Sequence, residues 1–200
     1  MPLEYESPLP FESIRQGEIL TGVCLLTPQH LPVALVEDEA VPFLSVSHNR
    51  MIVVNPDCDL DADFNVRFQP PDVLRTPGDW PDTGNHHSLV PVVWLCDVFE
   101  ESEIRGSGQP IASSDLWRRV RANQDERYHR FPPSQFRESA TQGLPELFLD
   151  FRKTYAVSTE WLYRAIAESA IQRVALVPSV YLHDFVQRYY SYYARVGLPD

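Results

Sequence analysis

The amino-acid sequence predicts a mainly β domain that carries added helices. Two apolar runs of strand length, residues 51–54 and 89–99, are rich in β-branched residues, which is typical of buried strands. The chain has 18 prolines against 8 glycines, which favours short elements joined by stiff connections. Its 200 residues, 44% of them apolar, are enough for one sizeable core.

Short strands are expected through the first half of the chain. Residues 1–14 form an irregular arm, and a first strand over 16–26 contains Gly22, which indicates a bulge or a tight bend. Residues 33–47 are expected to form two strands around an acidic turn, and the strand at 51–54 follows.

A long polar connection, residues 55–88, is predicted to be a loop between the two strongest strands. Asn55-Pro56 ends the preceding strand because proline cannot donate to a ladder. The chain then presents a carboxylate, a thiol and a second carboxylate in consecutive positions, at Asp57, Cys58 and Asp59. Such a strand end is where a rigid scaffold usually displays chemistry or binding.

Helix signals appear in the second half. A helix should begin at the serine pair 113–114, whose side chains can cap it. After a strand over 146–157, a second helix should begin at Ser158 and a third at Pro178, whose missing donor costs nothing in a first turn.

This order of elements resembles the small barrel of the PemK/MazF toxin class. The resemblance rests on the opening Gln16-Gly17-Glu18-Ile19, the strand Met51–Val54, and the segment Leu147–Ser158 before a helix. In addition, Asn55–Leu60 looks like a Ser-Gln-Asp-Cys-Asp-Leu-type turn of uncharacterised bacterial proteins.

The resemblance implies a mainly β fold with an SH3-like small barrel, an inserted helix and a C-terminal helical pair. The barrel domain is then expected over 1–157, with the long 55–88 loop, and a helical extension packed on it over 158–200. The toxins of this class cut RNA with a basic residue near the first loop and a hydroxyl on the third strand. Here Leu26–His30 has no arginine and Val92-Val93-Trp94 has no hydroxyl, so the ribonuclease activity does not carry over.

Charge and cysteine content restrict the partners and the compartment. The net charge is −11: residues 1–104 carry 18 acidic and 4 basic side chains, and residues 105–200 carry 10 and 13. So acidic a front half disfavours nucleic acid. The chain has no membrane-length apolar run and no signal-peptide pattern, and its three cysteines suggest free thiols. We therefore expect a cytoplasmic protein. No cofactor is expected.

A metal site is one interpretation of the acidic turn. Asp57 and Asp59 suit a hard cation. A separate hypothesis is a transition-metal site made by His86 and His87 with Asp79, Asp82, Cys96 and Asp97. The alternative is that the two carboxylates bond nearby backbone amides and that the histidines lie in a solvated loop. A thiol nucleophile made from Cys58 and His129 is a further possibility, which the acidic neighbours of the thiol disfavour.

The aromatic residues of the tail suggest a docking surface. Tyrosine is enriched at interfaces, and aromatics that point in several directions exceed what one packing face needs. Core packing and an interface remain equal alternatives for these residues. The candidate partner-binding residues are Tyr181, Phe185, Tyr189, Tyr190, Tyr193 and Trp117. Beside Trp117, the basic cluster Arg118, Arg119 and Arg121 is expected to be a solvated or protein-facing helix side.

Two functions therefore follow from the sequence. The first is a non-catalytic interaction or regulatory protein of a bacterial defence or toxin–antitoxin-like system, which binds another protein or a second copy of itself. The second is a metal-dependent nuclease or hydrolase that uses the Asp57–Asp59 turn. The missing toxin residues and the acidic front half favour the first.

Overall fold

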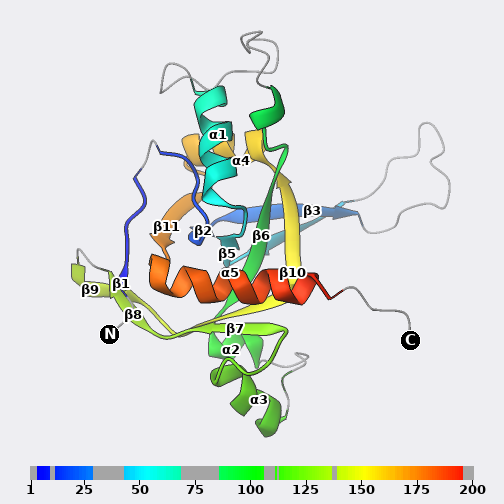
Figure 1. Ribbon diagram of the computed structural model, residues 1–200, viewed down its shortest axis with the longest axis vertical. Coiled ribbons are helices and arrows are strands. Elements are labelled where there is room, and N and C mark those ends of the chain that lie inside the picture. Colours follow the sequence, from blue (N-terminus) through cyan, green and yellow to red (C-terminus); the bar gives the residue numbers. More distant parts are fainter. Residues whose placement is uncertain are drawn as a thin grey trace, which may run out of the picture.

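A curled, six-stranded antiparallel sheet forms the centre of the protein (Figure 1). The structure, a computed structural model, describes residues 4–9, 12–28, 43–68, 86–105, 111, 113–136 and 139–195. In spatial order the strands are β11 (Gln172–Leu176), β2 (Glu18–Thr21), β5 (Arg50–Val53), β6 (Val92–Phe99), β10 (Leu147–Ser158) and β7 (Tyr128–Phe131). The sheet is a half-barrel in which each of these strands is antiparallel to its neighbours.

The longest strand, β10, gives the sheet its bend. Its first part pairs with β7 and its whole length runs along β6, but the register with β6 shifts between Leu149 and Thr154. An irregularity of this kind bends a strand and increases its local twist. The prediction of a strand over 146–157 is confirmed, and the bend explains how one strand contributes to both sides of the half-barrel.

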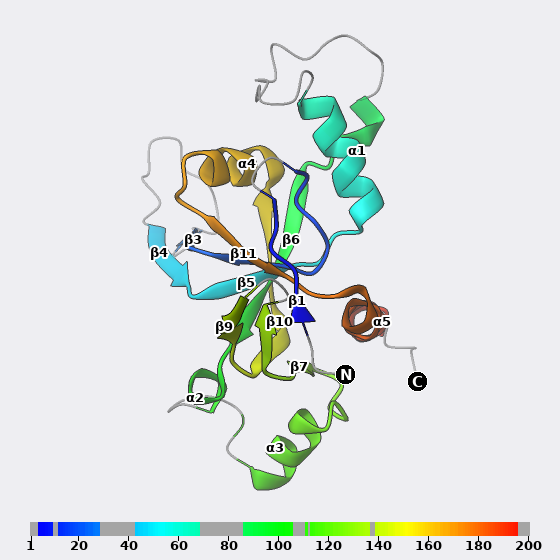
Figure 2. The ribbon, with the colours of Figure 1, turned by 90° about the vertical axis from the view of Figure 1, so that its left-hand side faces the viewer.

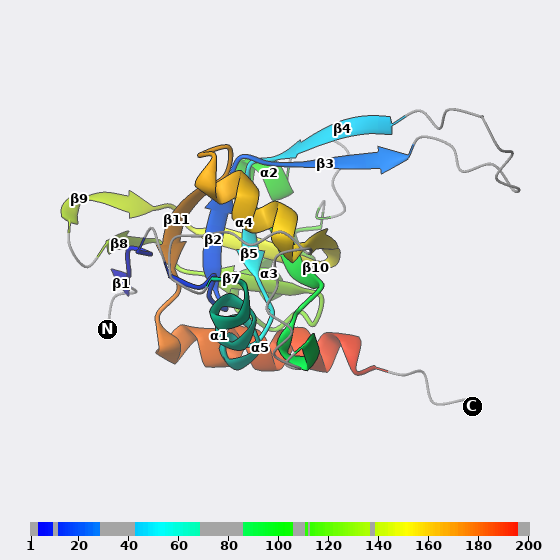
Figure 3. The ribbon, with the colours of Figure 1, turned by 90° about the horizontal axis from the view of Figure 1, so that it is seen from above.

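Two smaller sheets flank the centre. The strands β3 (Val23–Pro28) and β4 (Phe43–His48) form a hairpin that extends from the body (Figure 3), while β1 (Glu4–Tyr5), β8 (Ser134–Phe136) and β9 (Ser139–Leu144) form a three-stranded sheet. The predicted first strand is split at Gly22, which has φ of +82°, and a Cβ there would lie 2.5 Å from the carbonyl oxygen of Ala170. The predicted bend at Gly22 is therefore confirmed, whereas the acidic turn expected within 33–47 lies outside the described residues.

Helices cover both faces of the sheet (Figure 2). They are α1 (Asp57–Arg67), α2 (Glu101–Ile104), α3 (Ser114–Arg121), α4 (Thr159–Ala167) and α5 (Ser179–Tyr193), with a 3-10 turn η1 (His86–Ser88). The predicted caps are confirmed: Ser113 Oγ accepts from the amide of Leu116, and Ser158 Oγ accepts from the amide of Trp161. No helix in the described part of the chain has the length and apolar character needed to cross a membrane.

The helix α1 corrects the prediction of a 55–88 loop. Its sequence looks like a loop because it is polar, and its buried side combines the apolar Leu60 with an ion pair between Asp63 and Arg67. Asp63 is fully buried, its Oδ2 accepts from Arg67 Nε at 2.6 Å, and its Oδ1 accepts from the amide of Val90 at 2.8 Å. The remaining part of the predicted loop, residues 69–85, lies outside the described residues.

The last segment of the chain is not purely helical. β11 lies between α4 and α5 in the sequence and pairs with β2 at the edge of the central sheet. The residues 158–200, expected to form a helical extension, therefore supply part of the sheet and, through Phe185, part of the core.

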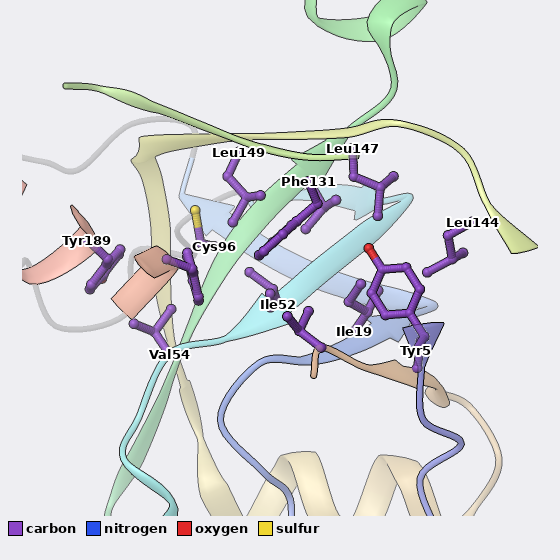
Figure 4. Close-up of a cluster of buried hydrophobic side chains, with 14 of the residues drawn as sticks. Tyr5, Ile19, Ile52, Val54, Cys96, Phe131, Leu144, Leu147, Leu149 and Tyr189 are labelled. Carbon is purple, nitrogen blue, oxygen red and sulfur yellow. The ribbon is translucent and has the colours of Figure 1, made fainter. Parts of the chain in front are cut away.

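The strands bury side chains on both faces of the sheet. Ile52 and Val54 belong to one apolar cluster, which Figure 4 shows, and Met51 and Val53 belong to a second. Neighbouring residues of a strand point to opposite faces. α5 covers the first cluster through Phe185, while α4 and α1 cover the second. This two-sided burial explains why the run at 51–54 is apolar without alternation.

Candidate functional site

α5 passes the turn between β5 and α1 and the neighbouring strand β6 (Figures 1 and 3). The side chains of these elements leave a hollow of about 420 Å³. We call it the Trp94 groove. It combines part of the polar turn after β5, which the sequence singled out, with part of the aromatic tail. The residues that line it are Val54, Asn55, Pro56, Asp59, Trp94, Tyr189, Tyr190 and Tyr193.

Asn55 holds the floor of the groove in place. The amide of Val54 donates to the carbonyl of Trp94 at 3.0 Å, and Asn55 Oδ1 accepts from the amide of Trp94 at 2.6 Å. Asn55 Nδ2 also donates to the carbonyl of Val92 at 3.3 Å. The side chain of Asn55 thus continues the β5–β6 pairing after the backbone ladder ends at Pro56, which fixes the position of Trp94 relative to the turn.

Trp94 is the functional candidate that the sequence interpretation missed. Its neighbours Val93 and Leu95 are fully buried, whereas 47% of Trp94 is exposed. The sequence contains the tryptophan, but only the structure shows that its side chain lies on the solvent side of the strand. The apolar character of the whole run concealed it, because the run does not alternate in a way that identifies the exposed face.

Asp57 is tied to the preceding chain. Its Oδ1 accepts from the backbone amide of Gln16 at 2.6 Å, and its Oδ2 lies 3.7 Å from Arg15 Nη2. The side chain of Gln16 in turn donates to the carbonyl of Val54 at 2.7 Å. As the first residue of α1, Asp57 also lies at the positive end of the helix dipole. These contacts favour the structural interpretation of this carboxylate.

Asp59, in contrast, faces the groove. It is exposed, and its Oδ1 lies 3.6 Å from the exposed Cys58 thiol. Burial raises the pKa of Tyr190, and the nearby charge of Asp59 raises it further. The two carboxylates that are adjacent in the sequence pattern therefore have separate surroundings: one stabilises the turn and the other contributes negative charge to the groove.

The structure does not bring the described metal candidates Asp57, Asp59 and His87 together. Within the described ranges, no group of three or more His, Cys, Asp or Glu side chains is arranged to hold a metal ion. His87 is exposed on η1, which contacts α1. The hydrogen bond from the amide of Val90 to Asp63 places η1 beside the second half of α1. Asp57 and Asp59, in contrast, are in the first turn of this helix. The side chain of His86 lies outside the described residues.

His129 does not approach Cys58. Its imidazole is 2% exposed and lies in the core, with ring centroids 4.6 Å from Phe131 and 5.6 Å from Phe185. Burial, together with the charge of Arg188, lowers the pKa of His129 to about 3, so the ring is neutral at physiological pH. Its Nδ1 is 4.0 Å from an oxygen of Asp184, beyond hydrogen-bonding distance. The structure therefore gives the possible thiol–imidazole pair no support, because the ring is buried whereas the Cys58 thiol is exposed on α1.

The aromatic residues of α5 divide between the core and the groove. Phe185 is fully buried and Tyr189 is 6% exposed, whereas Tyr190 and Tyr193 are 44% and 50% exposed. Tyr181 is partly buried and packs against the first cluster. Core packing therefore holds for Phe185 and Tyr189, and an interface stays a prediction for the exposed Tyr190 and Tyr193.

Trp117 belongs to the core and not to a partner-binding surface. It is 9% exposed, its ring centroid lies 4.9 Å from that of Phe148, and the Arg105 guanidinium lies 5.0 Å from its ring centroid. The neighbouring arginines of α3 are paired with acidic side chains: Arg118 and Arg119 with Asp115, and Arg121 with Glu146. These contacts agree with a solvated helix side.

A second ionisable pair lies apart from the groove. His48 Nδ1 is 2.5 Å from Asp97 Oδ1, both side chains are less than 10% exposed, and Tyr155 packs edge-on against the imidazole at 4.8 Å. Burial raises the pKa of Asp97, and His48 opposes that shift. The pair joins the end of β4 to β6, so it anchors the projecting hairpin to the central sheet.

No family model, curated protein or solved structure matches this chain. The function is therefore argued from the geometry of the groove.

Proposed function

We propose that this protein is a non-catalytic interaction or regulatory component and that the Trp94 groove binds a segment of a partner protein. The observation that carries the proposal is the clustering of three half-exposed aromatic side chains, Trp94, Tyr190 and Tyr193, around one hollow. Such side chains supply large contact areas with little loss of conformational entropy, and they dominate the binding energy of many interfaces.

The composition of the groove supports binding over catalysis. General acid–base or metal-assisted chemistry uses paired ionisable groups within reach of one substrate. Among the described residues that line the groove, Asp59 is the one side chain with a charge at neutral pH. Asp57, the second carboxylate of the enzyme hypothesis, is held by Gln16 and Arg15.

The partner is expected to be a different protein. Two copies of a chain with a net charge of −11 repel each other, whereas a partner with a basic segment is attracted. We therefore take a basic segment of another protein as the occupant, with a homodimer as the outcome that would contradict it.

The finer fold and the cellular setting form part of the same proposal. We infer an SH3-like barrel of the PemK/MazF type that acts in a bacterial defence or toxin–antitoxin-like system. The resemblance of residues 16–19 and 147–158 supports this inference, because these segments include the first half of β2 and all of β10, two strands of the curled sheet. This chain lacks the arginine of the first loop and the hydroxyl of the third strand with which the toxins cut RNA. A binding role therefore fits it better than cleavage.

The test compares two exposed tryptophans. Trp94→Ala removes the groove aromatic, and Trp161→Ala removes a 39% exposed tryptophan of α4 that does not line the groove. Proteins captured from the native host with each variant are identified by mass spectrometry, and the recovered partner is then purified and titrated by calorimetry. Trp94→Ala should weaken its binding by about tenfold or more, a typical loss for a central aromatic.

Trp161→Ala should bind the partner within about twofold of the wild type. Equal binding by the two variants would remove the groove from the interface. A native mass spectrum that shows a homodimer, lost on Trp94→Ala, would replace the proposed partner with a second copy of the chain.

A further inference from the structure

We propose that the Trp94 groove selects a positively charged side chain, an arginine or a lysine, from the partner segment. This inference rests on the proposed function and adds the chemistry by which the partner is recognised. Four features of the groove, which come from three separate segments of the chain, lead to it.

The first feature is the charge of Asp59, which has no cationic partner in the part of the chain that the structure describes. The neighbouring acids of α1 are engaged: Asp57 by Gln16 and Arg15, Asp61 by Ser13, and Asp63 by Arg67. Among the described residues, the one side-chain hydrogen bond of Asp59 is with the thiol of Cys58, at 3.6 Å. A cation that enters the groove would therefore meet an uncompensated carboxylate at its edge.

The second feature is the C-terminal end of α5. This 15-residue helix ends at Tyr193, beside the groove, and its last turn contains no basic residue. The carbonyl groups at the end of a helix carry a partial negative charge, which a cation within the last turn normally offsets. Arg195, just beyond the helix, is paired with Glu126, so its charge is offset and the helix end contributes partial negative charge beside the groove.

The third feature is the way the tyrosines are held. The hydroxyl of Tyr190 lies 3.5 Å from the carbonyl of Val54, and that of Tyr193 donates to the carbonyl of Phe151. With their hydroxyl groups directed at the backbone, these residues offer ring surface to a ligand instead of hydrogen-bond donors. Ring faces attract cations through their quadrupole, and tryptophan does so most strongly.

The fourth feature is the arrangement of the rings. Tyr189 contacts Tyr190 at 5.6 Å and Tyr193 at 4.9 Å between centroids, which joins the tyrosines into one wall. Within the described residues Trp94 shares no such ring contact, so the indole stands apart on β6. A groove with aromatic surface on two sides, a carboxylate at its edge and no cationic lining residue favours a guanidinium or ammonium group over an anion or a neutral side chain.

The experiment uses two peptides that differ in charge and hardly in shape. The ¹⁵N-labelled full chain is titrated with acetyl-Gly-Arg-Gly-amide and with the same peptide carrying citrulline, the neutral analogue of arginine. The reporter is the indole N–H signal of Trp94, assigned by its loss in Trp94→Phe. The arginine peptide should shift this signal in the millimolar range and bind about fivefold more tightly than the citrulline peptide.

Two variants of equal net charge separate local from long-range attraction. Asp59→Asn should weaken the arginine peptide by about fivefold and leave the citrulline peptide unchanged. Asp61→Asn removes the same charge two residues further along α1, from a side chain that does not line the groove. It should change neither affinity by more than about twofold.

Several outcomes would overturn the inference: equal binding of the two peptides, equal effects of the two variants, or no shift of the Trp94 signal by about 10 mM arginine peptide. Tetramethylammonium that bound more tightly than the arginine peptide would instead assign the groove to a free quaternary cation. If Trp94→Ala abolishes partner binding while arginine and citrulline bind alike, only the cation selectivity fails. If Trp94→Ala leaves partner binding intact, the proposed function itself fails.

Discussion

The two faces of α5 carry the same kinds of side chain in opposite surroundings. Phe185 and Tyr189 are buried against the curled sheet, and the half-exposed Tyr190 and Tyr193 form a wall of the Trp94 groove, which Tyr189 also borders. The side chains of residues 189 and 190 are both tyrosine and adjacent, yet one is 6% exposed and the other 44%. The comparison teaches that residue type does not distinguish a folding role from a binding role in this helix. The direction in which each side chain points from the helix distinguishes them.

The largest effect is expected on the buried face. Phe185→Ala should lower the free energy of unfolding by about 3–5 kcal/mol, because it leaves a cavity among Phe131, Phe151 and Tyr189. Chemical denaturation monitored by circular dichroism measures this loss. An effect below about 1 kcal/mol would mean that α5 does not depend on this contact for its attachment.

The next effect concerns pH and the imidazole beside Phe185. The pKa of His129 is about 3 in the folded protein and 6.5 in its ordinary state. Between these values the unfolded chain binds a proton that the folded chain does not, so stability is complete above pH 6.5 and falls as the pH decreases. At pH 5 the loss is about 2 kcal/mol.

His129→Leu should remove this part of the pH dependence. The measurement is the difference in unfolding free energy between pH 7 and pH 5, for the wild type and for the variant. Identical differences would show that His129 is protonated as readily in the folded protein as in the unfolded chain.

The exposed face should respond in binding instead of stability. Tyr190→Ala should weaken partner binding by about tenfold, which corresponds to about 1.4 kcal/mol, and change the unfolding free energy by less than about 1 kcal/mol. Tyr189→Ala, the adjacent substitution, should lose about 3 kcal/mol of stability because its ring packs on Phe151. Calorimetric titration and thermal unfolding of both variants test this reversal; equal stability losses would abolish the division of the helix into two faces.

The smallest effect distinguishes the two carboxylates of the turn. Asp57→Ala should cost about 1 kcal/mol, because the amide of Gln16 loses its acceptor, and Asp59→Ala should change stability by less than about 0.5 kcal/mol. Thermal unfolding at neutral pH compares them. A larger loss of stability for Asp59→Ala would mean that this carboxylate makes a stabilising contact, which would argue against its proposed role in binding a ligand.

Sequence patterns located much of the β-rich core and the helix starts. The strands at β5, β6 and β10, the bend at Gly22 and the caps at Ser113 and Ser158 were predicted, because each depends on residues within a few positions of one another. The helix α1 and the strand β11 were not. α1 needs Val90 and Arg67 to satisfy the buried Asp63, and β11 needs β2 as a partner, so neither has a sufficient local signal.

For the candidate site, the sequence by itself determined the ingredients: an acidic turn after a buried strand and an excess of aromatic residues in the tail. Only the tertiary structure decided which of them meet. It brings Asp59, Trp94 and Tyr190 to one hollow, buries Trp117 and His129, and ties Asp57 to the chain before β2. The physical reason is that the packing of α5 across the β5–α1 turn depends on the shape of the whole apolar core, which no short stretch of sequence contains.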